Sequence, residues 1–140
     1  MIVINETKIA EINKHAEQEY PNECCGALLG KIDSADRKVI ELIPISNNRE
    51  PETQHNRFLI RPEEFLECEK KALKQNLDLI GFYHSHPDHK SVPSDYDLNH
   101  ALPVYSYIIV SVKSGNADEL TSWLLRNDRT QFEQEEIQIL

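Results

Sequence analysis

The chain has 140 residues, of which 24 are acidic and 15 are Lys or Arg, so its formal net charge is −9. Nucleic-acid phosphates favour basic surfaces, so this charge balance argues against nucleic acid as a partner. The sequence has no run of eighteen apolar residues and no secretory signal pattern at its start. We therefore expect a cytoplasmic protein without a membrane span.

The length suits a single domain, residues 1–140, with one hydrophobic core. Three cysteines are an odd number, and Cys24 and Cys25 are adjacent, which does not fit an ordinary disulfide framework. We expect reduced thiols that serve as small, buried apolar groups. A metal-binding role for Cys24 or Cys25 stays open.

The first elements are a short strand and a helix. Residues 2–4 are apolar and β-prone, and we expect them to form an edge strand. Asn5 can cap a helix whose apolar residues recur at helical spacing, namely Ile9, Ile12, Ala16 and Tyr20.

A strand pair comes next. Residues 25–31 and 38–45 have strand-like patterns, and the polar residues 33–36 between them predict a turn. We expect a polar loop over residues 47–56 and a short strand over residues 57–60.

The second half alternates a helix with further strands. Pro62 suits the first turn of a helix that runs to about residue 75. Residues 77–83, 105–112 and 120–126 are rich in β-branched, aromatic or other apolar residues, and residues 132–139 predict a last strand. The whole pattern predicts an α/β fold, a single domain with a mixed, curved β-sheet flanked by helices.

The most informative segment contains two histidines and a carboxylate within fourteen residues. His84 and His86 follow the apolar strand, and Asp97 lies shortly after them. Residues i and i+2 of a strand point to the same face, so both imidazoles can reach one ion while Ser85 points away. Three such ligands leave a fourth position open for water, as in a catalytic zinc site.

Ser94 and Asp97 have two compatible interpretations. A Ser-x-x-Asp pattern is common at helix starts, where it explains both residues by capping alone. The same helix start, with a short helix running to about Ala101, would present Asp97 to the two histidines.

Glu23 is the best candidate for the base that a hydrolytic site needs. It stands where a polar turn passes into a small, apolar strand. A carboxylate at such a strand end is partly removed from water, which raises its pKa toward a useful value. Taken alone, Glu23 would be an ordinary solvated acid. What distinguishes it is its combination with the three potential metal ligands His84, His86 and Asp97, called the tripod below.

The pattern Glu23, His84-x-His86, Ser94 and Asp97 resembles the JAMM motif of the MPN-plus zinc metalloproteases, with all five positions filled. The similarity runs from about Ile9 to Leu125 and is greatest to the small prokaryotic single-domain members. It implies the JAMM/MPN, cytidine-deaminase-like architecture.

The resemblance also implies a mechanism. His84, His86 and Asp97 would bind one Zn²⁺ ion with water as the fourth ligand. Glu23 would take the proton of that water and pass it to the leaving amine, and Ser94 would donate a hydrogen bond to the oxyanion. Arg57 is a weaker candidate, for substrate binding.

The implied activity is hydrolysis of peptide or isopeptide bonds, as a JAMM-type zinc metallopeptidase. The expected partner is a ubiquitin-like or sulfur-carrier protein with a Gly-Gly-type tail, which an extended groove can accept. Dimerisation is common in this fold, so a homodimer stays open.

Three alternatives remain. A zinc deaminase is disfavoured because its His-x-Glu and Pro-Cys-x-x-Cys signature is absent. A phage or cell-wall type peptidase usually carries a second domain. A non-catalytic MPN-type scaffold would not need a complete motif.

Two further residues invite a functional reading. His100 could orient a metal ligand, although a surface or packing role is the simpler expectation. Trp123 is expected to pack in the core or at an interface.

Overall fold

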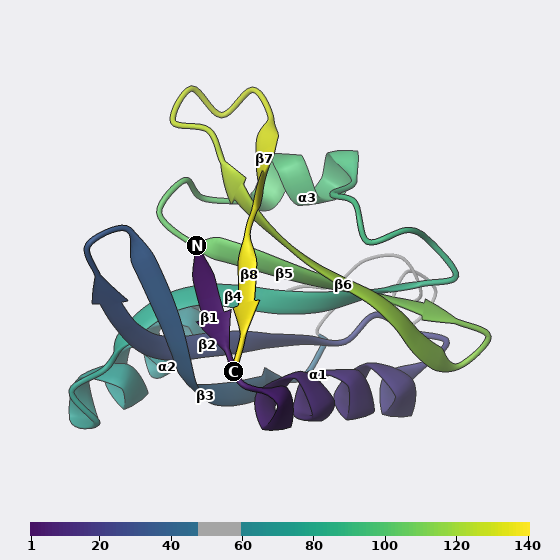
Figure 1. The fold of residues 1–140 in the computed structure, drawn as a ribbon, viewed down its shortest axis with the longest axis horizontal. Helices are drawn as coiled ribbons and strands as arrows, with labels where there is room; N and C mark the ends of the chain where they lie inside the picture. Colours follow the sequence, from purple (N-terminus) through teal and green to yellow (C-terminus); the bar gives the residue numbers. More distant parts are fainter. Residues whose placement is uncertain (48–59) are drawn as a thin grey trace.

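The computed structural model describes residues 1–47 and 60–140, in which eight strands form one curved sheet (Figure 1). The strands are β1 (Ile2–Ile4), β2 (Cys25–Asp33), β3 (Asp36–Ile45), β4 (Asp78–Pro87), β5 (Ser106–Lys113), β6 (Asn116–Leu125), β7 (Phe132–Glu135) and β8 (Ile137–Ile139). The helices in these ranges are α1 (Glu6–Glu19), α2 (Pro62–Lys74) and α3 (Asp95–His100). The predicted α/β fold with a mixed, curved sheet flanked by helices is confirmed, whereas the calls on residues 48–59 lie outside the described residues.

The two ends of the sheet meet. The strand order is β7-β6-β5-β4-β2-β3-β1-β8, with parallel pairing of β1 to β3 and β8 and of β4 to β5. Strands β7 and β8 stand at opposite ends of this order, although Glu136 alone separates them in the chain. The Ile2 N–H donates to the Glu136 carbonyl at 2.9 Å, so the chain joins the two ends and the sheet curls until it is nearly closed.

This closure corrects two expectations. Residues 132–139 form two strands rather than one, because the chain changes sheet partner at Glu136. Strand β1 is not an edge strand, because β8 pairs with the side that β3 leaves open. Both features depend on contacts between the two chain ends, which local patterns do not report.

The helices cover two faces of the sheet. Ile12 and Ala16 of α1 pack in a core cluster with Ile2, Leu28, Tyr83 and other residues of the first face. Phe65 and Cys68 of α2 and Leu98 of α3 pack with Phe82 and Tyr107 of the second face. All three cysteines are free and buried, as expected. No helix of the described ranges is long and apolar enough to cross a membrane.

A β-bulge in β4 decides which face receives the histidines. Leu28 pairs with Gly81 and Leu29 with Leu79, so Ile80 has no partner of its own on β2. In a regular strand Ile80 and Phe82 would point to the same face of the sheet. The extra residue changes this, so that Ile80 packs on the face covered by α1 and Phe82 packs on the face covered by α2 and α3. His84 thereby follows Phe82 onto the face where α3 lies.

Gly26 in β2 leaves space for the ring of Tyr83 from the neighbouring strand β4. A Cβ atom at Gly26 would lie 2.2 Å from Cε1 of Tyr83, whose ring is buried and hydrogen-bonded to His15 through its hydroxyl at 2.8 Å. We therefore expect Gly26→Ala to lower the free energy of unfolding by about 1–3 kcal/mol, the usual cost of overpacking. Urea unfolding measures this change, and an unchanged midpoint would contradict this account of the packing.

Candidate metal centre

The pairing of β2 with β4 brings Glu23 to the two histidines. Cys25 is paired with His84, so in this antiparallel arrangement Glu23 comes opposite His86. Ser85 anchors the approach, because its hydroxyl accepts from the Cys24 N–H at 2.8 Å and its own N–H donates to the Cys24 carbonyl at 3.1 Å. One ligand atom each of Glu23, His84 and His86 lies within 4.8 Å of the others, and all three side chains are buried.

Helix α3 delivers the second carboxylate. Ser94 caps this helix: its hydroxyl accepts from the Asp97 N–H at 3.1 Å, and Asp97 Oδ2 accepts from the Ser94 N–H at 2.9 Å. The same Oδ2 atom lies 3.2 Å from Nε2 of His84 and 3.1 Å from Nε2 of His86. The predicted capping pair is confirmed, and it holds the Asp97 carboxylate against both imidazoles.

The spacing of these donor atoms fits a tetrahedral metal ion. Nε2 of His84 and Nε2 of His86 are 3.1 Å apart, so the three distances are 3.1, 3.1 and 3.2 Å. Zinc–ligand bonds of about 2.0–2.1 Å at tetrahedral angles would separate two ligand atoms by roughly 3.3 Å. Two imidazoles and one carboxylate are also a typical donor set for zinc.

Two features favour metal binding by His86 and Asp97: a fixed ring orientation and a negative charge. His86 Nδ1–H donates to the Lys90 carbonyl at 2.8 Å, which fixes the orientation of the ring and keeps Nε2 at 3.1 Å from Asp97 Oδ2. Burial raises the pKa of the Asp97 carboxyl, but the adjacent His84 and His86 imidazoles more than offset this effect. The net pKa lies well below the ordinary value, so Asp97 is present as the carboxylate that a metal binds.

A clamp from β6 fixes the loop that follows the histidines. Thr121 Oγ donates to the Ser91 carbonyl at 2.5 Å, and the Trp123 indole N–H donates to the same carbonyl at 3.2 Å. Ser91 is the neighbour of Lys90, whose carbonyl orients His86. Trp123 therefore does more than the core or interface packing expected of it, and the sequence has no signal for this contact because β6 lies far from the motif.

The clamp predicts an effect on metal affinity. We expect Thr121→Val to lower zinc affinity about tenfold, at the lower end of the 10–100-fold range for residues that support metal ligands. Competition with a chromophoric chelator measures this affinity. Thr121→Ser, which keeps the hydroxyl, is the matched control. Equal affinities of the valine and wild-type proteins would show that the clamp does not support the centre.

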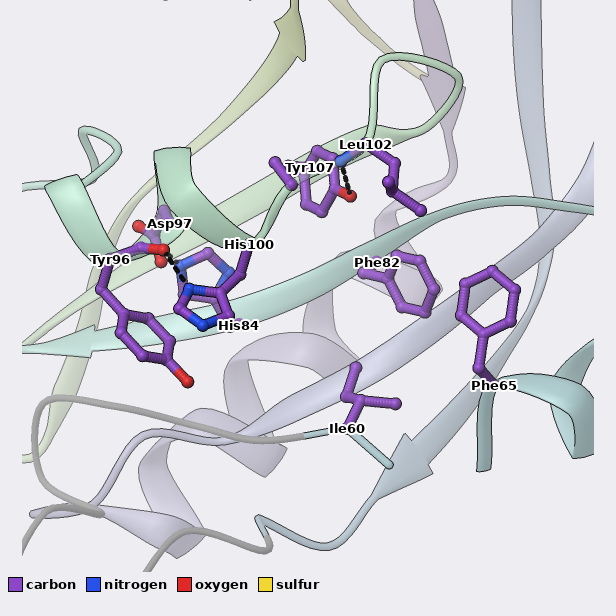
Figure 2. Close-up of a pocket in the computed structure, with 10 residues that line it drawn as sticks. Ile60, Phe65, Phe82, His84, Tyr96, Asp97, His100, Leu102 and Tyr107 are labelled. Carbon is purple, nitrogen blue, oxygen red and sulfur yellow. Dashed lines mark hydrogen bonds and ion pairs between the residues drawn. The ribbon is translucent and has the colours of Figure 1, made fainter. Parts of the chain in front are cut away.

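Two cavities meet at the centre. The larger, of about 690 Å³, is lined by Glu23, His86, Ser94 and residues of the loop after β4. The smaller, of about 170 Å³, is lined by His84, Asp97 and mostly apolar residues (Figure 2). The tripod thus lies between the two cavities, with His86 lining the larger one and His84 and Asp97 lining the smaller one.

The remaining candidates contribute no ligand atom to the tripod. His100 is exposed, stacks on Tyr96 with ring centroids 4.0 Å apart, and donates from Nδ1 to the Tyr96 carbonyl. It is thus a surface residue of α3 rather than a partner that orients a ligand. Arg57 lies outside the described residues.

Comparisons with known proteins converge on one family. Residues 6–126 match the model described as prokaryotic homologs of the JAB domain. A desampylase of Haloferax volcanii is 35% identical over 105 residues, which are 74% of this chain and 72% of that protein. A probable TtuB-protein conjugate cleaving protease of Thermus thermophilus is 30% identical over 102 residues, 72% of this chain and 64% of that protein.

Two further matches extend these comparisons. A solution structure of a protein from Desulfitobacterium hafniense superimposes with a TM-score of 0.87 at 31% identity, covering all of this chain and 93% of that one. Tail tip assembly protein K of Escherichia phage N15 is 33% identical over 89 residues, 64% of this chain but only 32% of the phage protein. The phage match is thus confined to a part of a much longer protein.

Proposed function

Because the chain belongs to the family of prokaryotic JAB-domain homologs, we propose that it is a zinc-dependent peptidase that cleaves ubiquitin-like or sulfur-carrier proteins from their conjugates or trims their tails. One observation carries this proposal. The ligand atoms of His84, His86 and Asp97 converge at tetrahedral spacing beside the buried carboxylate of Glu23. A scaffold without catalysis would not need this arrangement of buried polar groups, which are costly to desolvate.

In this proposal His84 Nε2, His86 Nε2 and Asp97 Oδ2 would hold one zinc ion. When bound, zinc supplies Lewis-acid chemistry: it polarises the scissile carbonyl and lowers the pKa of water. The protein supplies a rigid and buried ligand set, in which Lys90 and Ser94 hold His86 and Asp97 in place before metal arrives.

Glu23 serves as the general base and then as the general acid. Its carboxylate takes a proton from the attacking water, whose oxygen forms the new bond to the carbonyl carbon. The C–N bond then breaks, and Glu23 delivers the proton to the departing amine. The short strand pairing at Cys25 and His84 keeps the carboxylate within reach of the reacting atoms.

Ser94 stabilises the negative charge that develops on the carbonyl oxygen. Its Oγ atom accepts the Asp97 N–H, which leaves the hydroxyl hydrogen available for a substrate oxygen. Ser94 is exposed in the larger cavity, where that oxygen would lie. A preorganised donor of this kind acts mainly on the transition state.

The names of two relatives and the shape of the site support this substrate class. A desampylase and a probable TtuB-protein conjugate cleaving protease are both similar over about three quarters of this chain. The larger cavity is open to a narrow, extended tail, for which a Gly-Gly end is the simplest occupant. Arg57 stays a candidate for binding that tail.

Intact-mass spectrometry of two matched substrates tests the proposal. One is a ubiquitin-like carrier with residues added after its Gly-Gly end, and the other is the same carrier joined through an isopeptide bond to a lysine side chain. We expect the zinc-loaded protein to release a carrier that ends in Gly-Gly from at least one of them. A zinc-loaded protein that cleaves neither substrate would contradict the proposal.

A further inference from the structure

The smaller cavity has no part in the reaction described above. It lies on the face of α2 and α3, and one end of it is formed by His84, Tyr96, Asp97 and His100 (Figure 2). Phe65, Phe82 and Tyr107 form the other end, together with apolar side chains of lesser size. Its volume of about 170 Å³ is several times the roughly 30 Å³ that one water occupies in the liquid.

The walls of this cavity are ordered and offer carbon surface. The rings of Phe65 and Phe82 have centroids 5.7 Å apart, and those of Phe82 and Tyr107 are 6.1 Å apart. The Tyr107 hydroxyl accepts the Leu102 N–H at 2.8 Å, so this polar atom is already engaged. Aromatic rings held in this way form a preshaped pocket rather than a gap that collapses.

The apolar end of the cavity offers no partner to a charged occupant. No Lys, Arg or Glu is among the described lining residues, and the one carboxylate, Asp97, is held by the two imidazoles at the other end. His100 also lines that other end, where its Nδ1–H donates to the Tyr96 carbonyl. A charged side chain placed between Phe65, Phe82 and Tyr107 would lose its hydration without a compensating partner, which is costly. A large apolar side chain would bury carbon surface there at a gain.

We propose that this cavity is a specificity pocket for one large apolar side chain, of the leucine or phenylalanine class, close to the scissile bond of the substrate. Because His84 and Asp97 line both the pocket and the metal centre, a chain whose carbonyl lies at the centre has its neighbouring side chains close to the pocket. Glycine residues leave the pocket empty, so the occupant belongs to a residue beside a Gly-Gly pair. This inference rests on the proposed function.

A peptide series tests the preference. Each position flanking Gly-Gly in a tail peptide is changed in turn to Leu, Phe, Ala or Glu, and kcat/KM is measured with the zinc-loaded protein. At one position we expect Leu or Phe to exceed Ala and Glu by at least about tenfold, because single methylenes already give 10–200-fold discrimination in such pockets. Equal kcat/KM values for all residues at every position would overturn the inference.

Two pocket variants and one control sharpen this test. Phe65→Ala and the milder Leu102→Ala, whose side chain is 39% exposed, should each reduce the ratio of kcat/KM for the leucine peptide to kcat/KM for the alanine peptide. Leu66→Ala is the matched control, because this residue follows Phe65 on α2, is 51% exposed and is not a lining residue. A preference that survives both pocket variants would place the specificity elsewhere and overturn the inference.

A binding measurement separates this inference from the proposed function. NMR spectra of the Glu23→Gln protein with added zinc are recorded with the Leu and Ala peptides. The Leu peptide should shift the methyl signals of Ala101 and Leu102 but not those of Leu73, which is 77% exposed and outside the pocket. If these selective shifts occur but the wild-type protein cleaves no substrate, the specificity pocket is supported and the proposed peptidase function is rejected. Cleavage by the wild type without selective shifts would reject the pocket and retain the peptidase.

Discussion

Glu23→Gln should lower peptide hydrolysis by about 10²–10⁴-fold, the usual contribution of a general acid–base, while zinc remains bound. Glutamine keeps the size and position of the buried side chain but cannot take a proton from water at neutral pH. Initial rates of tail cleavage measure the first effect, and zinc content after gel filtration measures the second.

Glu19→Gln is the matched control for this variant. Glu19 is an exposed acid at the end of α1, close to Glu23 in sequence and outside the group of potential ligands. It should retain wild-type rates. A Glu23→Gln protein with wild-type rates would remove Glu23 from the reaction, and one that loses its zinc would make Glu23 a ligand instead.

Asp97→Ala should abolish both zinc binding and hydrolysis. The variant removes the oxygen that lies 3.1 and 3.2 Å from the two imidazole nitrogens, so only two ligands remain. The loss of affinity should exceed the 10–100-fold that supporting residues contribute, because a direct ligand is removed. Isothermal titration of the metal-free protein with zinc measures it.

Two other variants distinguish the metal role of Asp97 from helix capping. Asp95→Ala removes another acid from the first turn of α3, one that is exposed, and should leave zinc affinity unchanged. Asp97→Asn keeps an oxygen that can accept the Ser94 N–H but loses the negative charge. If Asp97→Ala lowered thermal stability and left zinc affinity intact, capping would be the only role of this residue.

Much of the candidate site could be predicted because its residues lie close in sequence and obey local rules. His84 and His86 share a face through the two-residue period of a strand, and Ser94 places Asp97 through the geometry of a helix cap. Glu23 is distant in sequence, and its position depended on the resemblance to a family rather than on local pattern. The strand pairing of Cys25 with His84 supplies the physical reason for its approach.

The missed features all depend on contacts between distant segments. The bulge at Ile80 selects the face that receives the histidines, and the switch at Glu136 closes the sheet. The bonds from Thr121 and Trp123 to the Ser91 carbonyl join β6 to the loop that follows β4. None of these leaves a periodic or compositional trace, because the residues involved are ordinary strand and loop residues.

The most direct test of the central claim is a zinc titration of the metal-free protein during cleavage of a tail-extended or conjugated carrier. The proposed single centre predicts no cleavage without metal and a rate that rises to a plateau at one zinc per chain. The plateau should be absent in Asp97→Ala and strongly reduced in Glu23→Gln. Full activity of the metal-free protein, or no cleavage at any zinc concentration, would contradict the claim.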